Sequence, residues 1–158
     1  MRILLAAANA QKGDLDGNLA RHLAALEQAR VQGCHLAVFP ELSLTGSVDP
    51  RTRPGRALTL DDGPVRALLE ATRRTGVAAV FGIAERDGPA FHITQVYGHD
   101  GRLGGAYRKR HLGQGEEGYR SGDGAGVFRL GAAGFGVTDC AEGGSTSPGT
   151  TPAPAGPR

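Results

Sequence analysis

The stretch HLAVF, His35–Phe39, is a short apolar run that ends at Pro40. Such a run is typical of a strand buried within a sheet. The residues before it, Asp16–Val31, repeat apolar side chains at helical spacing, which predicts a helix. Asp16 can cap the start of this helix and Gly33 can end it. The expected apolar face comprises Leu19, Leu23, Leu26 and Ala29 or Arg30.

A second apolar run, Arg2–Ala8, precedes the helix and predicts a strand buried on both faces. Strand, helix and strand in this order predict a β–α–β unit with parallel strands and a right-handed crossover. The opening MRILLAAANA also superficially resembles a secretory signal peptide. Its apolar run is at the short end for such a segment, so we interpret it as the first strand of the sheet.

The pattern of strands and helices continues to residue 138. Residues 50–64 are rich in Pro, Gly, Arg and Asp and predict a surface loop. Val65–Arg74 predicts a short amphipathic helix that Gly76 ends. Turns at Asp87–Gly88 and Asp100–Gly101 predict antiparallel neighbours. The expected strands are Val77–Ala84, Phe91–Tyr97, Leu103–Tyr107, Val127–Leu130 and Phe135–Thr138.

Length and composition indicate one soluble globular domain. The chain has 158 residues, 39% of them hydrophobic and 22% charged, which is enough for a core. It has no run of about 18 apolar residues, so no membrane partner is expected. A net charge of +2, with scattered arginines, gives no reason to expect a nucleic acid partner.

The cysteines and histidines form neither a disulfide framework nor a metal-binding pattern. Cys34 and Cys140 are interpreted as reduced thiols of a cytoplasmic protein. Cys34 stands where a small core residue would serve, and we assign it to packing. The histidines lack ligand spacing such as H-E-x-x-H, so no metal is expected. They are His22, His35, His92, His99 and His111.

Three short stretches carry residue types that make chemical sense together. Glu41 directly follows a buried strand, at the kind of strand end where sites form in α/β sheets. Lys109 lies in a basic cluster at the end of another strand. Cys140 lies at the end of an apolar strand, before a glycine-flanked turn. Taken singly, such a glutamate is more often solvated and such a cysteine more often buried and inert.

Together these residues predict nucleophilic catalysis. A cysteine attacks a carbonyl or nitrile carbon as a thiolate, or with a base that takes its proton. Glu41 can be that base and can later protonate the leaving amine. Lys109 can stabilise the thiolate and the developing oxyanion with a fixed positive charge.

The same stretches carry a resemblance to a known family. FPELSLTG at 39–46, YRKRHL at 107–112 and GFGVTDCAE at 134–142 resemble, in this order, the nitrilase or carbon–nitrogen hydrolase superfamily. Its members include amidases, nitrilases, carbamoyl-amine hydrolases and N-acyl transferases. The spacings from Glu41 to Lys109 and from Lys109 to Cys140 also fit, and the resemblance covers residues 1–143.

The resemblance implies a role for each matching residue. Glu41 matches the general base, Lys109 the lysine that stabilises the tetrahedral intermediate, and Cys140 the nucleophile that forms a thioester-type acyl-enzyme. The backbone N–H of Ala141 would help to hold the oxyanion. Glu116 matches a second glutamate that positions the lysine and the substrate. The neighbouring Glu117 fits nearly as well, and an exposed pair of loop glutamates is the alternative.

The implied function is hydrolysis of a small amide, carbamoyl compound or nitrile, without a metal or an organic cofactor. Three alternatives remain open on the sequence. The chain is an inactive remnant of such an enzyme, a binding module without chemistry, or an acyl transferase that depends on an added amine.

The implied fold is α/β, the N-terminal part of a four-layer α-β-β-α sandwich with the second half missing. Residues 1–143 would form this incomplete domain. Residues 144–158, GSTSPGTTPAPAGPR, contain no large apolar side chain and are expected to be disordered. This change of composition suggests a truncation or frameshift soon after Gly144, and pairing into a homo-oligomer could cover the exposed faces.

Other residues depart from the family pattern or receive structural assignments. Asp139 stands where the family has an apolar strand residue, and strand alternation turns it away from the face of Cys140. Arg108 and Arg110 are interpreted as parts of an exposed basic loop. His111 is interpreted as structural.

Overall fold

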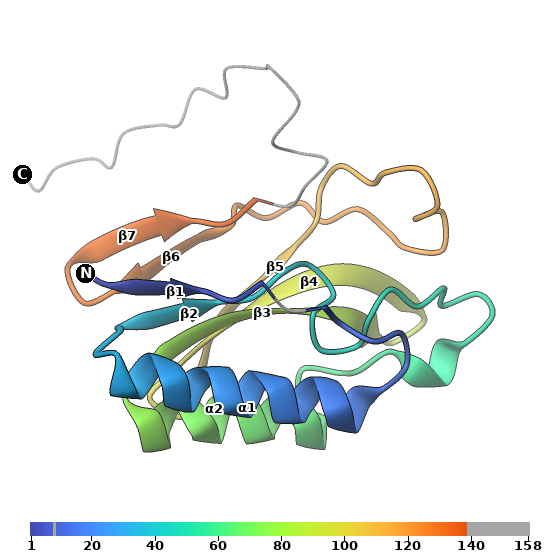
Figure 1. Cartoon of the computed structure of the whole chain (residues 1–158). Helices are drawn as coiled ribbons and strands as arrows, with labels where there is room; N and C mark the ends of the chain where they lie inside the picture. The colour runs from blue at the N-terminus through green and yellow to red at the C-terminus, as the bar shows by residue number, and fades with distance from the viewer. Residues whose placement is uncertain (8, 139–158) are drawn as a thin grey trace, which may run out of the picture.

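The computed structural model describes residues 1–7 and 9–138, and within these ranges five strands form one mixed sheet in the order β1-β2-β3-β4-β5 (Figure 1). β1, β2 and β3 run parallel, whereas β3, β4 and β5 are antiparallel neighbours, as the sequence predicted. The strands are β1 (Ile3–Leu5), β2 (Leu36–Val38), β3 (Ala78–Asp87), β4 (Ala90–His99) and β5 (Arg102–Arg108).

Two helices, α1 (Leu15–Val31) and α2 (Gly63–Thr75), lie side by side on one face of this sheet (Figure 1). The loop between β2 and α2 contains one short 3-10 helix, η1 (Pro54–Arg56). The apolar core between the helices and the sheet contains Leu26, Val65, Phe81 and Val96. Cys34 is buried in the same core, which is the packing role assigned to it.

A hairpin of β6 (Val127–Leu130) and β7 (Ala133–Gly136) covers the opposite face of the sheet (Figure 1). Phe128 packs against Tyr97 of β4, with ring centroids 5.2 Å apart. Phe135 meets the same tyrosine edge-on at 5.4 Å. The described residues therefore form layers of helix, sheet and hairpin. The segment expected to be a tail, 144–158, lies outside them.

β1 is an edge strand, which corrects the prediction that it is buried on both faces. Leu4 packs against the core, but the side chains of Ile3 and Leu5 are 43% and 77% exposed. Alternate residues of a strand point to opposite faces, and one face of β1 is open. An apolar run specifies a strand but not its place in the sheet.

The start and the inner face of α1 also differ from the prediction. Asp14, rather than Asp16, caps the helix by accepting the N–H of Gly17. The most buried positions follow one stripe that includes two polar residues, whereas Leu19 and Leu23 are only partly buried. The stripe is Asn18, His22, Leu26 and Ala29.

Asn18 binds two loops together from this stripe. Its side-chain amide accepts the N–H of Gln11 at 2.9 Å and donates to the carbonyls of Gln11 and Leu44 at 2.8 and 3.0 Å. The side chain is buried, so these backbone groups form hydrogen bonds with Asn18 in place of water. Asn18 thereby fixes the loop before α1 against the loop after β2.

No helix in the described part of the chain is long and apolar enough to cross a bilayer.

Replacing Asn18 with alanine should lower the free energy of unfolding by about 2–4 kcal/mol, because several backbone groups lose their partner while remaining buried. Urea unfolding followed by circular dichroism measures the change. Gln28→Ala, on the exposed side of α1, is the control and should stay within about 0.5 kcal/mol of the wild type. Equal stability of the two variants would contradict the role given to Asn18.

Candidate active site

Glu41 is placed by a sharp turn at the end of β2. Pro40 ends the strand, and Leu42 adopts a φ of 54°, a left-handed conformation that is unusual for a leucine. The turn crosses directly over Gly82 of β3, where a Cβ would lie 2.3 Å from the backbone nitrogen of Leu42. A residue with a side chain at position 82 would displace the turn and, with it, the carboxylate of Glu41.

The loop after this turn replaces β2 as the hydrogen-bonding neighbour of β3. The N–H of Leu44 donates to the carbonyl of Gly82 at 2.9 Å, and the hydroxyl of Ser43 accepts the N–H of Gly82 at 3.1 Å. His22 of α1 contacts the Ser43 hydroxyl from the other side, at 3.0 Å. Burial lowers the pKa of His22, which favours a neutral ring in this contact.

Lys109 follows β5 and is one of the most deeply buried charges in the described structure. Its side chain is 2% exposed, and its Nζ lies 3.1 Å from Oε1 of Glu41 and 2.7 Å from Oε1 of Glu116. The backbone N–H of Lys109 donates to the carbonyl of Ile93 in β4, which fixes the residue beyond the end of its own strand. One ammonium is thus held between two carboxylates that come from separate loops.

The structure distinguishes the two neighbouring glutamates that the sequence could not. Glu116 points inward, where Oε2 accepts the N–H of Gly113 at 2.6 Å while Oε1 binds Lys109. Glu117 is exposed and accepts the N–H of Gly115. Of these two glutamates, Glu116 is the one that contacts Lys109.

The two carboxylates determine the charge state of Lys109. Burial alone lowers the pKa of a lysine, but hydrogen bonds from Lys109 to Glu116 and Glu41, and their negative charges, outweigh this effect. The pKa of Lys109 is therefore raised, and its side chain keeps its proton at neutral pH.

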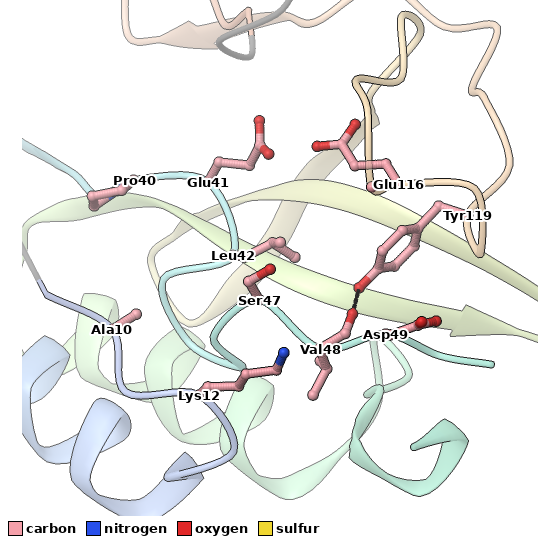
Figure 2. A pocket seen from close by; sticks show the side chains of 11 residues that line it. Ala10, Lys12, Pro40, Glu41, Leu42, Ser47, Val48, Asp49, Glu116 and Tyr119 are labelled. Carbon is pink, nitrogen blue, oxygen red and sulfur yellow. Dashed lines mark hydrogen bonds between the residues drawn. The ribbon is translucent and has the colours of Figure 1, made fainter. Parts of the chain in front are cut away.

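A cavity of about 540 Å³ opens beside these carboxylates (Figure 2). Glu41 and Glu116 point toward the same space from different loops, and the hydroxyl of Tyr119 donates to the carbonyl of Val48. Oε2 of Glu41 is buried and has no hydrogen-bond partner among the described residues. The other lining residues are Ala10, Lys12, Pro40, Leu42, Ser47, Asp49 and Gly115.

A second cavity, of about 330 Å³, also reaches Glu41. Gln95 of β4 lines it, and so do Val137 and Thr138, the last residues before 139. The proposed nucleophile Cys140, the proposed oxyanion donor Ala141 and the atypical Asp139 lie outside the described residues.

Arg108 is not part of an exposed loop, which corrects the sequence interpretation. It ends β5, and its guanidinium binds the buried Glu85 at 2.7 and 2.9 Å and Asp87 at 2.7 Å. These carboxylates are different from the two that bind Lys109. Arg110 is exposed, in agreement with the prediction.

Sequence reasoning missed the polar residues that support the site. Asn18 and His22 sit four positions apart, in line with Leu26, and this helical spacing was the available signal. Lys12 carried no signal in its local sequence. Within residues 1–7 and 9–138, no group of three or more His, Cys, Asp or Glu side chains could hold a metal ion.

Comparison with known proteins identifies the family. A family model described as carbon–nitrogen hydrolase matches residues 4–147. The chain therefore belongs to the carbon–nitrogen hydrolase family, which confirms the resemblance seen in its three motifs. The match extends across Glu41, Glu116, Lys109 and Cys140.

Individual relatives include a synthetase and a nitrilase. The glutamine-dependent NAD(+) synthetase of Thermotoga maritima is 34% identical over 114 residues, which are 71% of this chain and 19% of that protein. An aliphatic nitrilase of Rhodococcus rhodochrous is 32% identical over 135 residues, 74% of this chain and 37% of that protein.

Among solved structures, an amidase from Nesterenkonia sp. superimposes with a TM-score of 0.78 at 26% identity, covering 90% of this chain and 56% of its own. A structure of a variant of the amidase from Nesterenkonia sp. AN1, with glutamine in place of a glutamate, shows acrylamide joined to the active-site cysteine by Michael addition. The chain thus spans little more than half the length of this amidase and less of the two curated relatives.

Replacing Lys109 with methionine should lower the free energy of unfolding by about 3 kcal/mol, because two partly buried carboxylates would face each other without a cation. The pKa of Lys109 is higher in the folded protein than in the unfolded chain. The contribution of its charge to the free energy of unfolding is therefore complete below the ordinary lysine pKa, and it is lost as the pH rises through the pKa of the folded state. The gap between wild type and variant should therefore be constant from about pH 7 to 9 and shrink above about pH 10.5.

Urea unfolding across this pH range measures the gap. Arg66→Met, on the exposed side of α2, is the control for loss of a positive charge and should change stability by less than about 0.5 kcal/mol. A Lys109→Met protein as stable as the wild type at pH 7 would contradict the proposed charge balance.

Proposed function

We propose that this chain is a hydrolase that cleaves the C–N bond of a small amide, with Glu41, Lys109 and Cys140 as its catalytic set and Glu116 as a positioning residue. The observation that supports the proposal is the buried ammonium of Lys109 between Glu41 and Glu116, two carboxylates that line a cavity large enough for a small substrate. Family membership and the amidase relative support the same chemistry.

In the first step, the thiol of Cys140 gives its proton to Glu41, and the sulfur forms a bond to the amide carbon. Oε2 of Glu41, buried and without a hydrogen-bond partner among the described residues, suits an oxygen that accepts this proton. The carbonyl oxygen becomes an oxyanion. Lys109 stabilises it with a charge that the two glutamates already hold in place, so no reorganisation is needed.

The C–N bond then breaks as Glu41 returns the proton to the leaving nitrogen, and ammonia or an amine departs. A thioester remains on Cys140. Water gives a proton to Glu41 and attacks the thioester carbon, and the collapse of this second intermediate releases the acid. The cysteine sulfur recovers its proton from Glu41, so the enzyme ends as it began.

Glu116 acts through Lys109 rather than on the substrate in this scheme. One of its oxygens is held by the N–H of Gly113, so the other presents a fixed acceptor to Nζ. A lysine held by Glu41 alone would be free to turn away from the oxyanion. A nitrile is the alternative substrate, because the aliphatic nitrilase of Rhodococcus rhodochrous is a relative.

Acrylamide should label Cys140 selectively in the Glu41→Gln protein, because a glutamate-to-glutamine variant of the amidase from Nesterenkonia sp. AN1 forms such an adduct at its active-site cysteine. Intact-mass spectrometry should find one adduct per chain, which disappears in Cys140→Ala and persists in Cys34→Ala, since Cys34 is buried in the core. Lys109→Met should slow labelling by about tenfold through loss of thiolate stabilisation. Slow, equal labelling of both cysteines, indifferent to Lys109, would identify an inactive remnant.

Ammonia release from simple aliphatic amides should require the whole cluster. Glu41→Gln and Lys109→Met should each lower kcat/KM by about 10²–10³, and Cys140→Ala should abolish turnover. Glu116→Gln and Glu117→Gln are a matched pair that differ in whether the carboxylate reaches Lys109. Activity should fall in the first and persist in the second, and equal effects would contradict the positioning role of Glu116.

A further inference from the structure

The chain uses lysine very sparingly. Of its 18 Lys and Arg residues, only Lys12 and Lys109 are lysines. Lys109 binds both site carboxylates, and Lys12 lines the cavity that these carboxylates share. The other basic residues of the chain are arginines, so both of its lysine ammonium groups lie at one site.

Lys12 is built into the site rather than carried on a loose loop. The neighbouring Gln11 is held by the buried Asn18, which also binds Leu44 of the loop after Glu41. The two loops touch closely, since a Cβ on Gly46 would lie 2.7 Å from the Cα of Lys12. These contacts hold the loop of Lys12 against the loop that follows Glu41.

The other charges at the cavity are already paired. Glu41 and Glu116 share Lys109. Asp49 accepts the backbone N–H and the guanidinium of Arg51, at 2.9 and 3.0 Å. Lys12, by contrast, forms no ion pair with any described residue, and its side chain extends toward the segment that carries Ser47 and Val48 (Figure 2).

We propose that Lys12 binds a carboxylate of the substrate, so that the substrate is a short primary amide with an acidic group at its other end. The inference rests on the proposed function for the identity of the bond that is cleaved. The geometry points to one orientation. The Lys109 cluster has one more negative than positive charge and would repel an anion, but it accepts a neutral amide.

The rest of the lining suits the chain between the two ends. Leu42, Val48 and the ring of Tyr119 offer apolar surface between Lys12 and the Glu41–Glu116 end of the cavity (Figure 2). A few methylene groups would pack there. The cavity volume of about 540 Å³ is within the range of small-molecule sites.

Binding to the Cys140→Ala protein tests the inference without any turnover. Isothermal titration compares glutaramate, which carries the carboxylate, with pentanamide, a neutral amide of the same chain length. Glutaramate should bind about tenfold more tightly, in keeping with one partly exposed charged contact. Adding Lys12→Gln should remove this preference, and Lys12→Arg should keep most of it.

Arg53→Gln is the matched control. It removes the same charge from an exposed residue that does not line the cavity, so the preference for glutaramate should survive. Equal binding of the two amides, or a preference that persists in Lys12→Gln, would overturn the inference and leave Lys12 as a solvated surface residue.

Turnover by the wild-type chain separates this inference from the proposed function. Hydrolysis of both amides at equal efficiency, unchanged by Lys12→Gln, would leave the proposed function standing and reject the role of Lys12. No hydrolysis of either amide, with Lys12-dependent binding of glutaramate to Cys140→Ala, would reject the hydrolase and retain the carboxylate site.

Discussion

The architecture of the site depends on one buried ion cluster, the ammonium of Lys109 between the carboxylates of Glu41 and Glu116. A buried ammonium is costly unless it is paired, and here both partners come from loops other than its own strand end. The end of β5, the turn after β2 and the loop at 113–119 must therefore converge for any of the three charges to be tolerated. The three charges are therefore compatible with burial only when these three segments are packed together.

The cluster in turn depends on how the chain leaves β2. The left-handed Leu42 and the absence of a side chain at Gly82 let the turn lie flat on β3, and Ser43 and Leu44 then bind the backbone of that strand. On the inner face of α1, Asn18 donates to the carbonyl of Leu44 and His22 contacts the hydroxyl of Ser43. A purely apolar helix face would pack well, but it would leave the loop carbonyl of Leu44 without a donor.

This dependence explains what the sequence could reveal. Apolar runs reveal the strands, and the point where a run stops marks the end of its strand. The sequence alone therefore places Glu41 and Lys109 each at the end of a strand. Glu116 could not be separated from Glu117, because a loop of glycine and glutamate has no periodicity that tells inward from outward. Asn18 was overlooked for a different reason: its neighbour Leu19 satisfied the expected apolar repeat. The buried stripe uses Asn18 and His22 in place of Leu19 and Leu23, while Leu26 and Ala29 were predicted correctly.

Glu41 adjoins both described cavities, one lined by Lys12 and Tyr119 and the other by Val137 and Thr138. In the proposed mechanism a single carboxylate must exchange protons with the nucleophile, the leaving nitrogen and water in turn. A base enclosed by one pocket would meet only one of these groups. A carboxylate at the junction, with Oε1 fixed by Lys109 and Oε2 unengaged, can face the substrate on one side and the chain leading to Cys140 on the other. The division between the two oxygens is therefore the feature that fits Glu41 to repeated proton transfer.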